Sequence, residues 1–375
     1  MPHRDSSPQP HGSSPQPYGV DGPPPATRLT TPFAPGSVSI RLYPHDGLSA
    51  PEMVSELCAQ AGLALGSGFD GVMTSEHHGG FAGYLPNPLQ MVAFILDDHP
   101  TGWAAASPLL LPLRPSGLVA EETAWLAARH PGRVGLGVAA GALALDFEAM
   151  GIDRSSAPAR FAAQLPRVVA MLSGRDLGPL AGDPALARCA DHPVPVLSAA
   201  VSPTAARRAA SVGAGLLMEG MSDVDRLARL TSAYDGSGGS ASKVLIRRVW
   251  LGDVRRDLVD RQRQAYDGVT GDPAAFGVDQ TVSSTDPVRL AELLSGVARR
   301  AGATSLDLRV HLPGMAPESV RRQIRALGAE VVPRLKSGWD GSGVTTGEST
   351  RPTGGSRSGP PRRTSGRPRG SPTDG

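Results

Sequence analysis

Short apolar runs rich in β-branched residues alternate with helical stretches along most of the chain, and this alternation restricts the fold more than any other feature. It is typical of parallel strands joined by crossover helices. About eight such strands are expected, and eight is the number that closes a (β/α)8 TIM barrel. The expected strands are Val38–Tyr43, Phe69–Thr74, Gly102–Ser107, Val134–Val138, Val194–Ala200, Gly215–Met218, Val244–Trp250 and Leu306–Val310.

Proline marks the beginning of several expected helices, where its missing N–H costs no hydrogen bond. The expected helices are Pro51–Ala64, Pro88–Asp97, Leu118–Arg129, Pro158–Leu172, Pro203–Val212, Ser222–Ala233, Pro287–Ala301 and Pro317–Leu327. Two connections, Gly141 to Pro193 and Gly252 to Pro287, are much longer than the usual length of about two to six residues. We interpret both as insertions that shape the barrel mouth, and the second contains a charged helical run, Arg255–Tyr266.

Residues 1–36 and 337–375 differ in composition from the stretch between them. The first segment is rich in Pro, Ser, Gly and Gln and contains Ser-Ser-Pro-Gln-Pro twice, while the second has Arg in place of Gln. Neither segment offers enough apolar surface to offset the entropy lost on ordering. We therefore expect two disordered tails around a single barrel domain at residues 37–336.

The net charge of the chain is +2, and the C-terminal tail alone carries six arginines against three carboxylates. The rest of the protein is close to neutral and offers no electrostatic case for nucleic-acid binding. No apolar run reaches the roughly 18 residues of a membrane span, and the N-terminus lacks a signal-peptide pattern. Cys58 and Cys189 fit two reduced packing cysteines, because they have no CxxC partner. We expect a cytoplasmic protein without a membrane partner.

The triplet Glu76-His77-His78 follows an apolar strand-like run that ends at Thr74, and Gly79 and Gly80 cannot continue the strand. It therefore lies at the carboxyl end of a strand, the end that faces the ligand in a parallel barrel. Neighbouring residues of an extended chain point to opposite faces, so two adjacent imidazoles do not readily bind one metal ion. Acid–base or hydrogen-bonding work suits the triplet better, because a carboxylate can fix the tautomer of an imidazole. A polar cap that only ends the strand is the alternative.

The run Val134-Gly135-Leu136-Gly137-Val138 resembles a dinucleotide-binding loop only in part. Its glycines lie inside the expected strand, and no helix is expected to begin at Gly141. We interpret Gly135 and Gly137 as positions that admit bulky neighbours inside the barrel.

Five short motifs follow one another along the chain. They are Gly68-Phe69-Asp70, Glu76-His77-His78, Asn87-Pro88, Leu111-Pro112-Leu113-Arg114-Pro115 and Ala120-Glu121. Their order and spacing resemble the luciferase-like flavin monooxygenase family over about residues 38–335. The resemblance implies an oxidoreductase that acts on paired donors with incorporation or reduction of molecular oxygen, uses reduced FMN, and oxygenates a small organic substrate. It equally admits hydride transfer with the deazaflavin F420, and it implies a flavin reductase partner and a homodimer.

The resemblance also implies roles for individual residues. His77 would face the flavin as the catalytic residue, with Glu76 supporting its loop and His78 pointing outward. The expected cofactor contacts are Ser107, Ala139, Ala140, Gly141, Ser202 and Thr204, with Ser202 at the phosphate. The expected substrate contacts are Tyr43, His78, Tyr84, Trp250 and His311, and no metal site is expected.

The sequence departs from the family in one place. Several members have a basic residue just before the Ala-Glu pair, whereas Gly117, Leu118 and Val119 precede Ala120 here, with Arg114 nearby. Aromatic residues make up only 4% of the chain, so few rings are available to stack on a flavin. A barrel that binds a ligand or partner without catalysis is therefore a further hypothesis.

Overall fold

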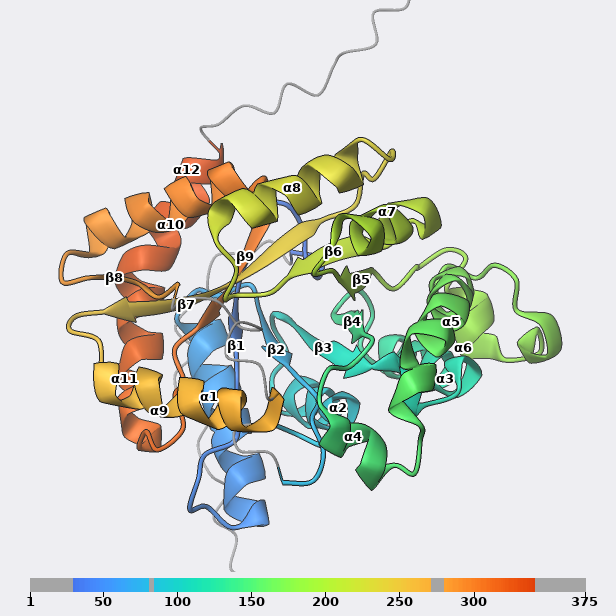
Figure 1. The fold of residues 1–375 in the computed structure, drawn as a ribbon, viewed down its shortest axis with the longest axis horizontal. Coiled ribbons are helices and arrows are strands. Elements are labelled where there is room, and N and C mark those ends of the chain that lie inside the picture. The colour runs from blue at the N-terminus through green and yellow to red at the C-terminus, as the bar shows by residue number, and fades with distance from the viewer. Residues whose placement is uncertain (1–29, 81–83, 271–279, 341–375) are drawn as a thin grey trace, which may run out of the picture. The chain divides into compact units, whose positions relative to one another are not determined.

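Eight parallel strands form a closed barrel in the computed structural model, which describes residues 30–80, 84–270 and 280–340. Neighbours in the ring follow chain order from β1 to β7, β9 lies between β7 and β1, and the β6–β7 pairing closes the ring (Figure 1). The (β/α)8 fold predicted from the sequence is therefore confirmed. The barrel strands are β1 (Val38–Arg41), β2 (Gly71–Thr74), β3 (Trp103–Leu110), β4 (Val134–Ala139), β5 (Val196–Ala199), β6 (Gly215–Met218), β7 (Lys243–Leu251) and β9 (Ser305–Arg309).

Helices surround the barrel, and each of the eight predicted helices is present with its limits shifted by only a few residues (Figure 1). They are α1 (Ala50–Gly66), α2 (Pro88–Asp98), α3 (Ser116–Arg129), α5 (Ala157–Met171), α7 (Pro203–Val212), α8 (Val224–Asp235), α10 (Pro287–Ala301) and α11 (Pro317–Ala326). Side-chain caps define several of the helix starts. Ser202 accepts a hydrogen bond from the backbone of Ala205 at α7, and Asp286 accepts one from Val288 at α10.

Both long connections contain short elements that the sequence pattern did not reveal. Between β4 and β5 lie α4 (Ala144–Ala149) and α6 (Pro184–Arg188), on either side of α5. Between β7 and α10 lie α9 (Arg256–Thr270), the expected charged helix, and β8 (Val282–Ser284), which pairs in parallel with β7 outside the ring. Elements of three to six residues are too short to show a hydrophobic period.

The described structure extends past the predicted barrel limits at both ends. Phe33 is buried inside the barrel, and α11 continues through a π-helical turn (Leu327–Val331) into α12 (Val332–Asp340). The boundaries at 36 and 337 therefore fall within folded segments. The rest of both predicted tails lies outside the described residues.

An apolar cluster lies inside the barrel, near the beginnings of the strands. Phe33 and Trp103 pack edge to face with their ring centroids 5.3 Å apart. A Cβ atom at Gly135 would lie 2.6 Å from the Phe33 ring, and one at Gly71 would lie 2.1 Å from the Trp103 ring. The packing role predicted for Gly135 is confirmed, because only a glycine leaves room for the ring.

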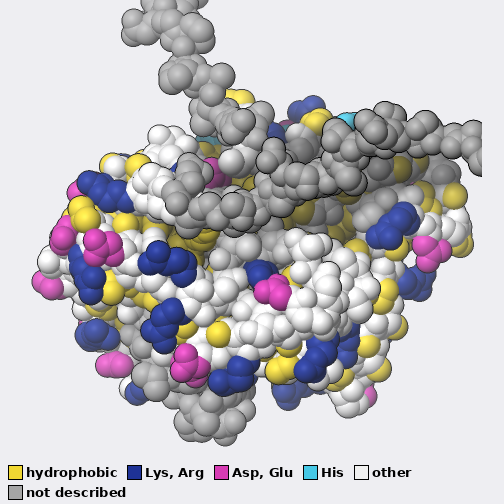
Figure 2. Space-filling view, turned by 90° about the horizontal axis from the view of Figure 1, so that it is seen from above, with side chains coloured by type: hydrophobic (Ala, Val, Ile, Leu, Met, Phe, Trp, Pro, Cys, Tyr) yellow, Lys and Arg dark blue, Asp and Glu magenta, His cyan; other side chains and the backbone are white. Residues whose placement is uncertain are grey.

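Positive and negative side chains are interspersed over the face of the molecule seen in Figure 2. This mixture agrees with the near-neutral body expected from the sequence. Cys58 and Cys189 are both free and buried, as predicted. Within the described ranges, no helix combines the length and apolar character needed to cross a membrane.

Candidate active site

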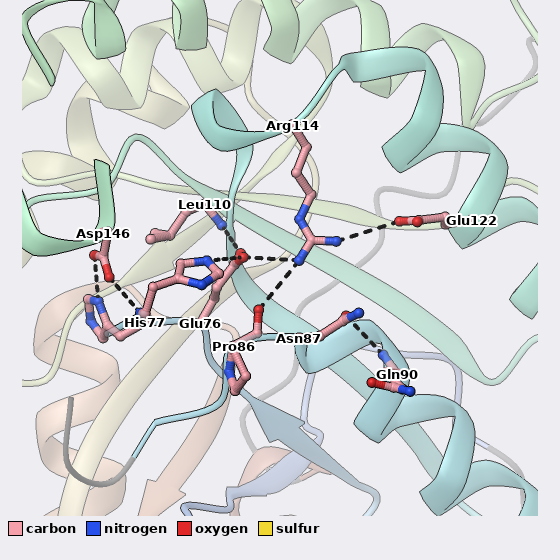
Figure 3. Close-up of polar contacts among 10 residues, drawn as sticks. Glu76, His77, Pro86, Asn87, Gln90, Leu110, Arg114, Glu122 and Asp146 are labelled. Atoms are coloured by element: carbon pink, nitrogen blue, oxygen red, sulfur yellow. Dashed lines mark hydrogen bonds and ion pairs between the residues drawn. The ribbon is translucent and has the colours of Figure 1, made fainter. Parts of the chain in front are cut away.

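Glu76 joins three segments at the carboxyl end of β2. Its carboxylate accepts hydrogen bonds from the Leu110 backbone N–H at 2.6 Å, from His78 Nε2 at 2.9 Å and from Arg114 Nη2 at 3.1 Å (Figure 3). The side chain is 1% exposed, so these charge-assisted bonds offset the loss of its hydration. Glu76 thus ties the loop after β2 to the end of β3 and the turn that follows it.

Asp146 fixes the next residue, His77, from the opposite side of the loop. His77 Nδ1 lies 2.8 Å from one Asp146 oxygen, and the backbone N–H of His78 donates to the other at 2.7 Å (Figure 3). Asp146 lies on α4 and is fully buried, while the His77 side chain is 16% exposed. With Nδ1–H donating to the carboxylate, Nε2 is the nitrogen that can accept a proton.

Sequence reasoning missed Asp146. The two partners are 69 positions apart, and Asp146 lies in a connection where only α5 was expected. His78 also differs from expectation, because it is buried against Glu76 rather than pointing outward. His77 and His78 do point to opposite sides, as an extended chain requires.

A cavity of about 710 Å³ opens at the carboxyl ends of the strands. The predicted site residues that line it are Tyr43, Glu76, His77, Tyr84, Ala139, Ala140 and Gly141. Those that are not among its described lining residues are His78, Ser107, Ser202, Thr204, Trp250 and His311. The cavity also contains residues that sequence reasoning missed, including Ser75 and the strand arginines Arg41, Arg248 and Arg309.

Three rings form one wall of the cavity. Tyr84 meets both Tyr43 and His77 edge to face, with centroid distances of 5.2 Å and 4.4 Å. The Arg309 guanidinium lies 4.5 Å from the centroid of the Tyr43 ring. Burial raises the pKa of the Tyr43 hydroxyl above its usual range, and the nearby Arg309 opposes this only in part, so Tyr43 stays neutral at ordinary pH.

His311 lies behind this wall rather than in it. Its ring stacks on Tyr43 with centroids 5.5 Å apart and meets His45 edge to face at 4.8 Å. Burial, with smaller contributions from His45 and Arg309, lowers the pKa of His311 well below its usual value, so the imidazole is neutral. Its predicted contact with substrate stays a prediction.

The predicted phosphate position borders the cavity. Val201 lines the cavity, and Ser202 and Thr204 follow it at the start of α7. The Ser202 hydroxyl caps the helix, and Thr204 is exposed. Arg114, which lies near the basic position of the family, is directed to Glu76 and to Glu122, 3.7 Å away (Figure 3).

Ser107 and Trp250 lie on strands beside the cavity. Ser107 points into the barrel toward β4, where a Cβ atom at Gly137 would lie 2.1 Å from the Ser107 hydroxyl oxygen. Gly137 therefore permits a close approach between strands, but the neighbour that it admits is the small Ser107 and not the bulky side chain that was expected. Trp250 is buried in the main hydrophobic core.

A closed parallel barrel with a cavity at the carboxyl ends of its strands defines the class of TIM-barrel proteins with a ligand site in the usual place. The family model for luciferase-like monooxygenases matches residues 38–327, and the chain belongs to this family. The family recognised from the short motifs is thereby confirmed. A search among curated proteins found no significant match.

Several solved structures share the fold. Monooxygenase RslO1 from Streptomyces bottropensis is 22% identical with a TM-score of 0.66, covering 79% of this chain and 99% of that one. The oxygenating constituent of 3,6-diketocamphane monooxygenase from Pseudomonas putida, solved with FMN, is 17% identical with a TM-score of 0.62, covering 79% and 98%. An F420-dependent secondary alcohol dehydrogenase, solved with an F420-acetone adduct, is 15% identical with a TM-score of 0.59, covering 80% and 98%.

Proposed function

We propose that the protein is a flavin-dependent monooxygenase that uses reduced FMN and O2 to oxygenate a small organic substrate. The observation that carries the proposal is His77, which lies in the cavity wall with Nδ1 held by the buried carboxylate of Asp146. A histidine oriented by a carboxylate at the ligand end of a barrel is equipped for acid–base work. The family and the FMN-bound structural neighbour support the choice of cofactor.

The residues of the cavity fit a planar ring system. Ala139, Ala140 and Gly141 form a wall of small side chains, and the three-ring wall of Tyr43, Tyr84 and His77 also lines the cavity. The hydroxyl of Ser75 is buried at the cavity without a hydrogen-bond partner among the described residues, so it can serve a polar atom of a ligand. Ser202 and Thr204 would hold a phosphate through their hydroxyls and through the backbone N–H of Thr204 in the first turn of α7.

When bound, reduced flavin supplies the electrons that activate O2. The chain's own contribution is made by three groups. His77 Nε2 accepts or returns a proton, and Asp146 keeps the ring in the tautomer that makes this possible and stabilises the imidazolium when it forms. Glu76 holds the loop in place through its bonds to β3 and Arg114.

F420-dependent hydride transfer is a second candidate, favoured by a specific feature of the cavity mouth. Arg154, Arg226 and Arg263 line the mouth with exposed side chains, and F420 carries a longer anionic tail than FMN. In this version a hydride passes between F420 and the substrate without oxygen. An F420-dependent enzyme is among the structural neighbours.

Titration of the purified chain with reduced FMN and, separately, with reduced F420 tests both candidates. Fluorescence reports binding, and the oxidation rate in air reports reactivity. Saturable binding of reduced FMN, with an oxidation rate lowered by His77→Ala and unchanged by the exposed control His192→Ala, would support the oxygenase. Binding of reduced F420 alone would replace it with the second candidate. If neither binds to the folded chain, the protein is a barrel without flavin catalysis.

The family also predicts a flavin reductase partner and a homodimer. Both stay predictions. Analytical ultracentrifugation tests the dimer, and a stimulated oxidation rate on adding an NADH-dependent flavin reductase tests whether reduced flavin can be delivered from another protein.

A further inference from the structure

Three arginines lie in register on three neighbouring strands. Arg41 on β1 pairs with Arg309 on β9, and Arg309 pairs with Arg248 on β7. Side chains in register on neighbouring parallel strands point to the same face, and all three arginines line the cavity. These residues, Arg41, Arg309 and Arg248, form an arginine row across one side of the barrel interior.

Burying such a row of positive charges is unfavourable. Like charges side by side on adjacent strands repel one another, and Arg41 and Arg309 are only 2% and 8% exposed. Asp307, two residues before Arg309 on the same face of β9, compensates part of this charge, because its carboxylate accepts a bond from Arg41 Nε at 2.7 Å. One carboxylate thus lies beneath a row of three guanidinium groups.

The whole cavity shares this positive bias. Its described lining contains six arginines: Arg41, Arg154, Arg226, Arg248, Arg263 and Arg309. The carboxylates in the same lining are Glu76, Glu219 and Asp260. Two of these have other partners, since Glu76 accepts from Arg114 and Glu219 accepts from the Met221 backbone and the Ser222 hydroxyl. A negative ligand is therefore the complementary one.

The wall that faces the row leaves space for the body of such a ligand. In the closed ring, β4 lies opposite β9, and β4 ends in Ala139, Ala140 and Gly141. His77 follows β2, between these two sides of the ring. A ligand whose anionic end meets the row and whose body rests on β4 would pass His77.

We propose that the arginine row is an oxyanion subsite for the organic substrate, and that this substrate carries a carboxylate. The guanidinium group matches the planar, two-oxygen shape of a carboxylate and can bind it through two parallel hydrogen bonds. The row is separate from the phosphate position suggested at Ser202, because β5, which precedes Ser202, lies opposite β1 in the ring. That this ligand is the organic substrate rests on the proposed function, whereas the preference of the arginine row for a carboxylate does not.

Calorimetric titration of the full chain with 2-naphthoate and with its neutral counterpart 2-naphthamide is the first test. The two probes share size and shape, so their affinity ratio isolates the charge. Naphthoate should bind at least about tenfold more tightly than naphthamide, because only the carboxylate brings a negative charge to the guanidinium groups of the row. Equal affinities would overturn the inference without the need for any variant.

Arg309→Gln tests the row itself. This variant should lose at least about tenfold in naphthoate affinity and keep its naphthamide affinity, and Arg309→Lys should recover part of the loss because it restores the charge. Arg289→Gln, which removes an exposed arginine on α10, is the matched control for net charge and should leave both affinities unchanged. If circular dichroism shows that Arg309→Gln does not fold, Arg248→Gln takes its place.

Flavin titrations of the same variants separate this inference from the proposed function. Lost naphthoate binding with unchanged flavin binding supports a substrate subsite. Weakened flavin binding with unchanged naphthoate binding would mean that the row holds the cofactor, and it would overturn the inference. A wild-type chain that selects naphthoate but binds neither FMN nor F420 would keep the subsite and overturn the proposed function.

Discussion

The inner face of the barrel changes character between the beginnings and the ends of its strands. Near the beginnings it is an apolar cluster built on Phe33, Trp103 and Met73. Near the ends it carries the arginine row, Asp307 and the Glu76–His77 loop, and buried charge replaces packing. Both levels are formed by the same strands, whose alternate side chains point to the inside of the barrel. The comparison indicates that the apolar level stabilises the barrel, whereas the polar level lowers its stability and forms the candidate site.

The largest expected effect separates the two levels by stability. Trp103→Ala should lower the free energy of unfolding by about 3–5 kcal/mol, because it leaves a cavity inside the apolar cluster, next to Phe33. The Trp103 indole N–H has no hydrogen-bond partner among the described residues, so the loss is one of packing. Urea denaturation followed by circular dichroism measures it.

The matched control for this variant is Trp125→Ala. Trp125 is 55% exposed on α3, where its indole N–H donates to Asp183, and its removal should cost at most about 1 kcal/mol. Similar losses for the two tryptophans would refute the view that the apolar cluster is the stabilising level.

The apolar level is also the one that the sequence predicted best. Apolar runs rich in β-branched residues located all eight barrel strands, and Gly135 was correctly interpreted as a position that admits a bulky neighbour. These signals are local, since each depends on the residues of one strand. Fold class follows from such local signals because eight is the number of parallel strands, alternating with helices, that closes a barrel.

The polar level was predicted only in part, and the reason is physical. The Glu76–His77 loop was visible because strand and glycine signals surround it in the sequence. Asp146 was not, because its contact with His77 depends on how the β4–β5 connection folds back. The arginine row was missed for the same reason, since it exists only through the register of β1, β9 and β7. Side chains that long-range contacts bring together have no characteristic spacing in the sequence that could reveal them.

The next largest effect concerns Asp146 and depends on the proposed function. In Asp146→Asn the amide oxygen can still accept from His78 N–H, but the amide nitrogen would face His77 Nδ1 and favour the opposite tautomer. The oxidation rate of the bound reduced flavin should fall about 100-fold, the lower range for general acid–base catalysis, with flavin affinity unchanged. Stopped-flow absorbance measures the oxidation rate, and flavin fluorescence measures the affinity.

Asp153→Asn is the control for this positioning role. Asp153 lies in the same connection and caps the short turn Arg154–Ser156 at the surface, so its loss should leave both the oxidation rate and the flavin affinity unchanged. A variant Asp146→Asn that kept the wild-type oxidation rate would show that His77 does not need its carboxylate. A loss of flavin binding would instead show that Asp146 only supports the loop.

The smallest expected effect is a change in the pH dependence of stability caused by His311. Its pKa is lowered in the folded state by burial, and by the nearby His45, Arg309 and Arg248, so below about pH 6.5 the unfolded chain binds a proton that the folded chain does not. The free energy of unfolding therefore falls as the pH drops below the pKa of the histidine in the unfolded chain, by up to about 1.4 kcal/mol per pH unit. His311→Phe keeps a ring against Tyr43 but cannot titrate.

Urea denaturation at several pH values between 7 and 5 (about the range in which an unfolded histidine titrates) should therefore give a shallower slope for His311→Phe than for the wild type. His192→Gln, which removes an exposed histidine, should keep the wild-type slope. Parallel slopes for His311→Phe and the wild type would mean that the imidazole finds a partner for its proton in the folded state. The stack behind Tyr43 would then belong to the polar level of the barrel, and the boundary between packing and site would lie deeper than the cavity wall.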